Sequence, residues 1–282
     1  MIYKRISRLS KVCFFLKNPR NYWSIAVKIL VNCSYRGIMK LVKIMTIQVD
    51  NLKIRYIQYG EGIDIVLLHG WGQNIEMMKP LADALPGYRY TILDFPGFGE
   101  SEEPKSDWNT TDYTEFLEHF LKQVNVKNPI VIGHSFGGRV AICYASRNEV
   151  SKVVLFGAPC VRSERKSLKE SILKTAKKLP GMNKVGEFAK KYIGSTDYRN
   201  ATPVMRKTLV NVINQDLSEE AKKIKAPTLL IWGSLDTEAP IEDAKKLEAL
   251  LEDGALITLE GCTHYAYLEA LQQVVNILKN FI

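Results

Sequence analysis

The chain has 282 residues, of which 46% are hydrophobic and 24% charged, a composition that is typical of a folded protein and excludes wholesale disorder. Its net charge of +9 is unevenly spread: residues 1–44 carry +10, residues 162–207 carry +9, and the remainder carries −10. Because the main body is acidic, the positive net charge gives no ground for general nucleic-acid binding, and no known nucleic-acid motif supports binding through the basic arm. The five cysteines are scattered and form no C-x-x-C pair, which argues against a disulfide framework or a zinc site and indicates a reducing, cytoplasmic location.

The first 44 residues differ from the rest of the chain. They hold basic residues around apolar clusters, and Lys28 interrupts the longer cluster, so it falls short of the about 20 apolar residues that span a bilayer. As a helix, this arm would present apolar faces with basic flanks, which favours peripheral contact with a membrane surface. The alternative is that translation starts at Met39 or Met45 and that the arm is a misassigned start. A secretory signal is disfavoured because no small-residue cleavage site follows.

After Met45 the pattern alternates between strands and helices. A β-hairpin comes first, with strands at 47–50 and 53–59 that turn at Asn51. The later predicted strands are the apolar runs 64–68, 88–93, 129–133, 152–157, 227–232 and 255–259. Amphipathic spacing predicts helices at 75–85, 111–124 (with Thr110 or Thr111 as N-cap), 136–146, 241–251 and 265–281. The pattern predicts an α/β fold with a mostly parallel, doubly wound sheet and antiparallel edge strands from the hairpin.

Residues 160–216 interrupt this alternation. The segment is rich in lysine and helical in character, with Pro180-Gly181 between two parts. Since the strand and helix pattern resumes afterwards, we interpret it as a helical lid inserted into a core formed by residues 45–159 and 217–282. The first basic residues of this segment are Arg162, Arg165, Lys166 and Lys169. We expect them either to form a rim that recruits an anionic substrate or to keep a surface helix solvated.

A nucleophile motif lies between a predicted strand and a predicted helix. The sequence Gly133-His134-Ser135-Phe136-Gly137 fits the G-x-S-x-G turn, in which side chains at the flanking glycines would clash with neighbouring elements. The turn would hold Ser135 in a strained conformation, with its hydroxyl exposed at the N-terminus of a helix. The placement of the motif predicts that Ser135 is a nucleophile.

A serine nucleophile needs a base and an orienting carboxylate. His264 follows the last predicted strand and is the only histidine downstream of Ser135. Asp236 is the first acid after the strand 227–232, and Glu238 or Asp243 could substitute for it. The loop after the strand 152–157 offers no acid, which favours Asp236. The chain order Ser135, Asp236, His264 is the order in which this kind of sheet carries a triad.

An oxyanion hole requires two backbone N–H donors. One is expected from Phe136, directly after the nucleophile, and the other from Trp71 in the loop that follows the strand 64–68. Gly70 and Gly72 let this loop turn toward the site, and we expect His69 to support the loop rather than act as the base. The loop from Asp94 to Ser101 is interpreted as a structural turn.

With these parts in place, the sequence resembles the α/β-hydrolase superfamily over residues 47–282. The motifs that carry the resemblance are HGWG, DFPGFGES, GHSFGG, WGSLD and GCTH. Within the superfamily it resembles most the small serine carboxylesterases, including those that act on pimeloyl carrier-protein methyl esters. Carbon–carbon bond hydrolases and cofactor-free perhydrolases carry the same triad and remain alternatives. A non-catalytic ligand-binding member of the same fold is a further alternative, disfavoured because every triad residue is present.

The resemblance implies a serine esterase that forms an acyl-enzyme. Ser135 would attack the carbonyl, His264 would move the proton, and the Trp71 and Phe136 amides would hold the oxyanion. No metal or organic cofactor is required. The expected partner is a small-molecule ester or acyl substrate, with an acidic acyl carrier as a further candidate partner and no nucleic acid.

Overall fold

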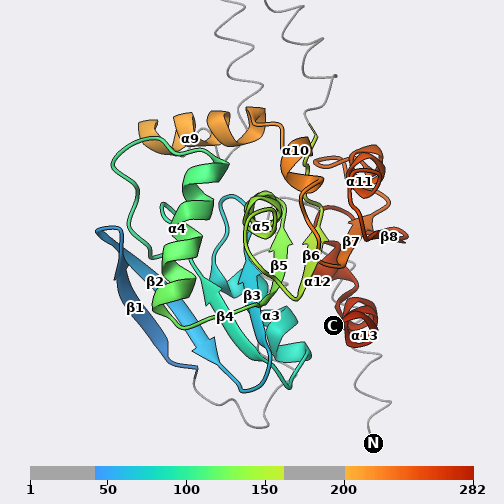
Figure 1. Cartoon of the computed structure of the whole chain (residues 1–282), viewed down its shortest axis with the longest axis horizontal. Helices are drawn as coiled ribbons and strands as arrows, with labels where there is room; N and C mark the ends of the chain where they lie inside the picture. The colour runs from blue at the N-terminus through green and yellow to red at the C-terminus, as the bar shows by residue number, and fades with distance from the viewer. Residues whose placement is uncertain (1–41, 162–200) are drawn as a thin grey trace, which may run out of the picture. The chain divides into compact units, whose positions relative to one another are not determined.

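The computed structural model describes residues 42–161 and 201–282, and these residues form an eight-stranded sheet. The order across the sheet is β1-β2-β4-β3-β5-β6-β7-β8 (Figure 1). β2 pairs antiparallel with β1 and β4, and the other neighbours pair in parallel. The strands are β1 (Ile44–Val49), β2 (Leu52–Tyr59), β3 (Asp64–Leu68), β4 (Arg89–Leu93), β5 (Ile130–His134), β6 (Lys152–Phe156), β7 (Thr228–Gly233) and β8 (Gly254–Leu259). The predicted α/β class and mostly parallel sheet are confirmed.

Helices cover both faces of this sheet (Figure 1). One face carries α4 (Thr110–Gln123), α5 (Phe136–Ala145) and α11 (Ile241–Glu248), whose apolar residues share one buried cluster. The other face carries helices that contact one another: α3 (Ile75–Ala84), α12 (Ala266–Glu269) and α13 (Leu271–Phe281). The remaining described helices are α9 (Pro203–Asn214) and α10 (Ser218–Ala221).

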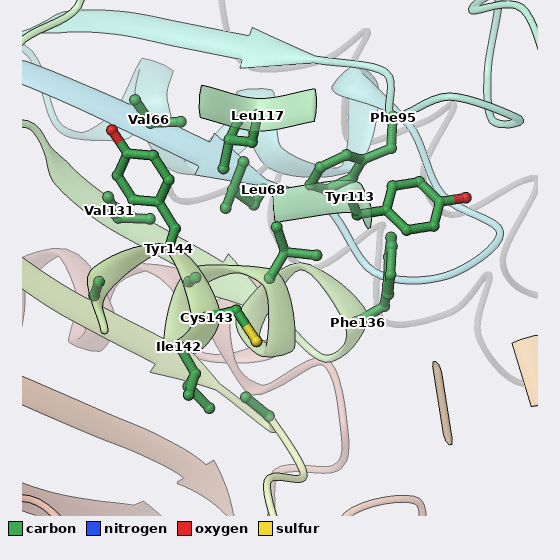
Figure 2. Close-up of a cluster of buried hydrophobic side chains, with 14 of the residues drawn as sticks. Val66, Leu68, Phe95, Tyr113, Leu117, Val131, Phe136, Ile142, Cys143 and Tyr144 are labelled. Carbon is green, nitrogen blue, oxygen red and sulfur yellow. The ribbon is translucent and has the colours of Figure 1, made fainter. Parts of the chain in front are cut away.

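Strand residues alternate between the two layers, as the pleat of a strand requires. In β3, Val66 and Leu68 join the cluster beneath α4 and α5, which Figure 2 shows in close-up. Ile65 and Leu67 are equally buried but lie outside that cluster. Burial on both faces explains why the parallel strands read as continuous apolar runs. The carboxyl ends of these strands meet at one edge, where the loops that follow them can converge.

Three local features differ from the sequence-based expectations. The N-cap of α4 is Asn109, whose side chain accepts the amides of Thr111 and Asp112 while the Asp112 carboxylate accepts the Asn109 amide. This capping box corrects the expected cap at Thr110 or Thr111. The helix expected over 265–281 is divided at Ala270 into α12 and α13. The short helix α10 was not predicted.

Two predicted segments lie largely outside the described residues. They are the arm, of which residues 1–41 are not described, and the lid, of which residues 162–200 are not described. β1 begins at Ile44, one residue before the expected start of the core. Within the described part of the chain, no helix is both long enough and apolar enough to cross a membrane.

Candidate active site

The turn between β5 and α5 holds Ser135 in a strained backbone conformation. Its φ is 50° and its ψ −112°, a region that residues with a side chain seldom occupy. A Cβ at Gly133 would lie 2.5 Å from the carbonyl oxygen of Gly137, and a Cβ at Gly137 would lie 2.3 Å from that of Leu68. The two glycines therefore let α5 start directly against the ends of β5 and β3, and Ser135 lies between the end of β5 and the start of α5.

His264 and Asp236 form a hydrogen-bonded pair. The distance from His264 Nδ1 to Asp236 Oδ2 is 2.7 Å, and both residues are buried. The second carboxylate oxygen, Oδ1, accepts the backbone amides of Glu238 at 2.9 Å and Ala239 at 2.8 Å. Because both oxygens are engaged, the carboxylate is fixed in orientation, and His264 must carry its proton on Nδ1 to donate to it. The other ring nitrogen, Nε2, is left free to accept a proton.

The end of β6 brings this pair beside the elbow. The Ser135 amide donates to the carbonyl oxygen of Phe156 at 2.8 Å, and Gly157 follows directly. A Cβ at Gly157 would lie 2.9 Å from His264 Nδ1 and 3.1 Å from Asp236 Oδ2. No hydrogen bond between the Ser135 hydroxyl and the His264 ring is recorded in the described part of the chain. In ligand-free enzymes, hydrogen bonds between catalytic groups are often long and tighten when substrate binds.

The two acids named as substitutes for Asp236 occupy other positions. Glu238 Oε2 lies 3.6 Å from His264 Nε2, on the opposite side of the ring from Asp236, and its side chain is 66% exposed. Asp243 lies on α11, 3.8 Å from the ammonium group of Lys246. Among these three acids, Asp236 is the one that meets the Nδ1 side of His264.

The loop after β3 lies beside the elbow, with the Trp71 ring edge-on to the Phe136 ring at a centroid distance of 5.4 Å. Gly72 has a φ of 70°, which turns this loop tightly. The Gly70 amide is already taken by the Gln73 side chain at 3.0 Å. Within the described residues, the amides of Trp71 and Phe136 donate to no protein acceptor.

His69 is buried and turned toward the neighbouring loop. Its Nε2 accepts the amide of Phe95 at 3.0 Å, and its Nδ1 lies 2.7 Å from the Gly70 carbonyl oxygen, to which it donates. Burial lowers the pKa of His69 to about 4, so the ring is neutral at physiological pH. The ring therefore ties two loops together and offers no free nitrogen for proton transfer.

The His134 ring lies between the backbone of His264 and the side chain of Gln73, which belongs to the loop after β3. Its Nε2 lies 3.0 Å from the backbone carbonyl oxygen of His264, and its Nδ1 lies 3.3 Å from Gln73 Oε1. Burial lowers the pKa of His134 to about 3, so the neutral ring carries one proton, which Nε2 donates to His264. No motif marked this contact, because it joins residues 130 positions apart.

Asp94 organises the loop after β4. Its buried carboxylate accepts the amides of Ile75 at 2.8 Å and Glu100 at 2.9 Å and pairs with Arg55 at 3.0 Å. These contacts fix the start of α3 and the turn of the loop, so both carboxylate oxygens of Asp94 are engaged within the fold. At Gly97 in the same loop, a Cβ would lie 2.5 Å from Met205 Sδ, so α9 packs directly on this loop.

Arg139 joins both borders of the expected lid to the helix of the nucleophile. Its guanidinium donates to the carbonyl oxygens of Pro159, at 2.6 Å, and of Gln215. The two segments that border the expected lid are also joined to each other, because the Leu217 amide donates to the Cys160 carbonyl oxygen at 3.1 Å. Arg139 is buried, and its Nε has no partner among the described residues. The residues expected at the lid rim, Arg162, Arg165, Lys166 and Lys169, lie outside the described residues.

Comparison with known proteins points to a family. A sequence profile described as the alpha/beta hydrolase fold matches residues 65–185. The match and the relatives below support membership of the α/β-hydrolase superfamily. The AB hydrolase superfamily protein YisY of Bacillus subtilis is 24% identical over 252 residues, which cover 79% of this chain and 92% of YisY. The pimeloyl-[acyl-carrier protein] methyl ester esterase of Aliivibrio fischeri is 26% identical over 248 residues, which cover 79% of this chain and 95% of that protein.

The solved structures agree on the fold of this α/β hydrolase. An esterase from Exiguobacterium antarcticum matches with a TM-score of 0.68 at 23% identity, covering 84% of this chain and 98% of the esterase. The prediction that the protein is an enzyme of the hydrolase class is confirmed by its relatives. Among the described residues, no group of three or more histidine, cysteine or acidic side chains is arranged to hold a metal ion.

Proposed function

We propose that this α/β hydrolase cleaves carboxylic esters through a covalent acyl-enzyme, with Ser135, His264 and Asp236 as its triad. The observation that carries the proposal is the buried hydrogen bond between His264 Nδ1 and Asp236 Oδ2, 2.7 Å long, beside a serine with a φ of 50°. A buried carboxylate that orients a histidine, next to a strained serine, matches what a weak hydroxyl nucleophile requires for activation.

Each residue has a distinct role in the proposed reaction. Ser135 Oγ attacks the ester carbonyl while His264 Nε2 takes its proton. The tetrahedral intermediate places its negative oxygen at the Trp71 and Phe136 amides, and the N-terminus of α5 adds a favourable dipole. His264 then gives the proton to the leaving alcohol, and the acyl group stays on Ser135. In the second half, His264 takes a proton from water, and the hydroxide attacks the acyl carbon. The bond from Ser135 Oγ to the acyl group then breaks, the acid leaves, and His264 returns its proton to Ser135 Oγ.

The named relatives support an ester as the substrate. The name of the Aliivibrio fischeri protein describes an esterase for a methyl ester on an acyl carrier protein. We extend this to a small-molecule ester as the substrate, and an acidic acyl carrier is a second candidate partner through the basic residues that begin the lid segment. Carbon–carbon bond hydrolysis or perhydrolysis by the same triad would be recognised by the substrate alone, since Ser135 and His264 would be essential in each case.

Two measurements test the proposal. A fluorophosphonate probe should label the wild-type protein at Ser135, and a series of p-nitrophenyl esters of increasing acyl length should be hydrolysed. Ser135→Ala and His264→Ala should each lower kcat by at least about a thousandfold because triad residues act as a unit. Circular dichroism and thermal unfolding would check that both variants fold. If folded Ser135→Ala keeps most of the wild-type turnover, the proposed nucleophile is wrong.

A further inference from the structure

Glu238 is held at a fixed place beside His264. It lies in the turn after β7, and its backbone amide donates to Asp236 Oδ1 at 2.9 Å. The Ala239 amide donates to the same oxygen at 2.8 Å, so the turn wraps around the Asp236 carboxylate. Since Asp236 also holds the His264 ring, the backbone of Glu238 is set relative to that ring rather than free to move with a surface loop.

The Glu238 side chain reaches the reactive nitrogen. Its Oε2 lies 3.6 Å from His264 Nε2, and 66% of the side chain is exposed to solvent. In acyl transfer, the base nitrogen returns its proton to the leaving group, so the leaving-group oxygen must come next to Nε2. A carboxylate at this distance from Nε2 therefore faces the leaving group of a bound ester.

Within the described part of the chain, no lysine or arginine pairs with the Glu238 carboxylate. In residues 42–161 and 201–282, the recorded ion-pair contact of Glu238 is with His264 alone, and no lysine or arginine lies within 4 Å of its carboxylate. On the other flank of the elbow the described side chains are aromatic, with the Trp71 ring edge-on to Phe98 at 4.8 Å and to Phe136 at 5.4 Å. These rings carry no formal charge, so within residues 42–161 and 201–282 they do not compensate the field of Glu238.

We propose that Glu238 is a specificity residue that selects the charge of the leaving group, favouring cationic over neutral and neutral over anionic alcohols. The inference rests on the proposed ester hydrolysis. The carboxylate attracts an ammonium group placed a few ångströms from the scissile oxygen and repels a sulfonate or phosphate at the same place. Because Glu238 is largely exposed, water and salt screen it, and the expected preference is about two- to fivefold in kcat/KM.

The test compares three esters with the same acyl group. Choline, 3,3-dimethylbutyl and 2-sulfoethyl esters present a cationic, a neutral and an anionic leaving group, and the acyl chain is the one that the p-nitrophenyl series favours. The measured quantity is the ratio of kcat/KM for the charged ester to that for the neutral ester, at one ionic strength. The ratio cancels any general effect of Glu238 on His264. Glu238→Gln should lower the cationic ratio and raise the anionic ratio by about two- to fivefold, and Glu238→Lys should shift both further.

Glu242→Gln is the matched control. Glu242 is an exposed acid in the first turn of α11, four positions along the chain, and the same charge is removed without a contact to His264. Both ratios should stay at the wild-type value in this variant. Unchanged ratios in Glu238→Gln, with Ser135 still labelled by fluorophosphonate, would overturn the role of Glu238 alone. Wild-type protein that is neither labelled nor active on any ester would instead overturn the proposed function.

Discussion

The side chain of His134 donates to the backbone carbonyl oxygen of His264, with 3.0 Å between the two atoms and 4.8 Å between the ring centroids. On its other side the His134 ring meets Gln73, which holds the Gly70 amide of the loop after β3. The Nδ1 atom that faces Gln73 Oε1 carries no proton, so the His134 ring packs against the loop of the proposed oxyanion donor, while its hydrogen bond goes to the loop of the proposed base.

Replacing His134 by Phe should loosen the loop that carries His264. The aromatic size is kept but the donor to the His264 carbonyl is lost, so kcat should fall about tenfold while KM changes little. His134→Asn, which restores a donor, should recover part of the loss. Steady-state kinetics of both variants, alongside their thermal unfolding, would check this. A loss of stability with unchanged kcat would show that the ring only supports the fold.

Asp236→Asn should lower kcat by about three to four orders of magnitude. An amide cannot accept the Nδ1 proton of His264 in the same way, so the ring adopts the wrong tautomer or orientation. The comparison is Glu238→Gln, which removes an acid from the opposite side of the same ring and should cost far less on a neutral ester. Equal losses in the two variants would contradict the assignment of Asp236 as the orienting acid.

Gly157→Ala should impair turnover through geometry alone. The new methyl group would lie 2.9 Å from His264 Nδ1, and the ring must shift to make room, so kcat should fall about a hundredfold. Gly87→Ala is a matched control, because Gly87 also has a positive φ, 105°, but no atom within 4 Å of the added carbon. The control should lose stability without losing kcat. Equal kcat in the two variants would count against the placement of His264 beside Gly157.

Arg139→Met should lower the free energy of unfolding by about 2 kcal/mol, since the carbonyl groups of Pro159 and Gln215 lose a charged donor inside the protein. Arg147→Met serves as control. Arg147 is partly exposed and lies 3.9 Å from the carboxylates of Glu115 and Glu118, so its removal should cost under about 0.5 kcal/mol. Urea unfolding of the two variants measures both values, and similar small losses would contradict the anchoring role of Arg139.

Mild acid should destabilise the fold through two buried histidines. Burial lowers the pKa of His69 to about 4 and that of His134 to about 3, whereas both take up protons near pH 6.5 when unfolded. The unfolded chain therefore binds more protons below pH 6.5, and stability, full above that pH, falls by up to about 1.4 kcal/mol per pH unit per histidine. Urea unfolding at pH 7, 6 and 5 measures the slope. Ring resonances that titrate near pH 6.5 in the folded protein would refute the prediction.

Periodicity predicted most of the fold because the spacing of apolar residues reflects whether a strand or helix is buried on one face or on two. The run at 64–68 matches β3 residue for residue, and the positive φ angles of Asp50 and Asn51 fit the predicted hairpin turn. The cap at Asn109 was missed because neighbouring threonines are also good caps. The division at Ala270 was missed because the apolar spacing continues through it, while Glu269 binds the Thr263 amide at 2.6 Å.

The candidate site was likewise predicted in part from the sequence. Chain order and strand ends pointed to Ser135, Asp236 and His264, since each follows a strand whose end meets the same edge. Two kinds of contact could not be predicted. They are the hydrogen bond of His134 to His264 and the hydrogen bonds of Arg139 to two carbonyl groups that are distant in sequence. Each depends on the direction of one side chain between segments far apart in sequence, and no local pattern encodes such a direction.

Arg139 also has a consequence for how such an enzyme can change. The helix that starts at the nucleophile holds the carbonyl groups of Pro159 and Gln215. Both lie in the excursion of the chain between the end of β6 at Phe156 and the start of β7 at Thr228. An exchange of the chain between these two carbonyl groups that keeps α9 retains both contacts of Arg139 and the packing of Met205 beside Gly97. Evolution, or an engineer building chimeras, can therefore exchange the intervening segment as a cassette and search for new substrates without rebuilding the catalytic centre.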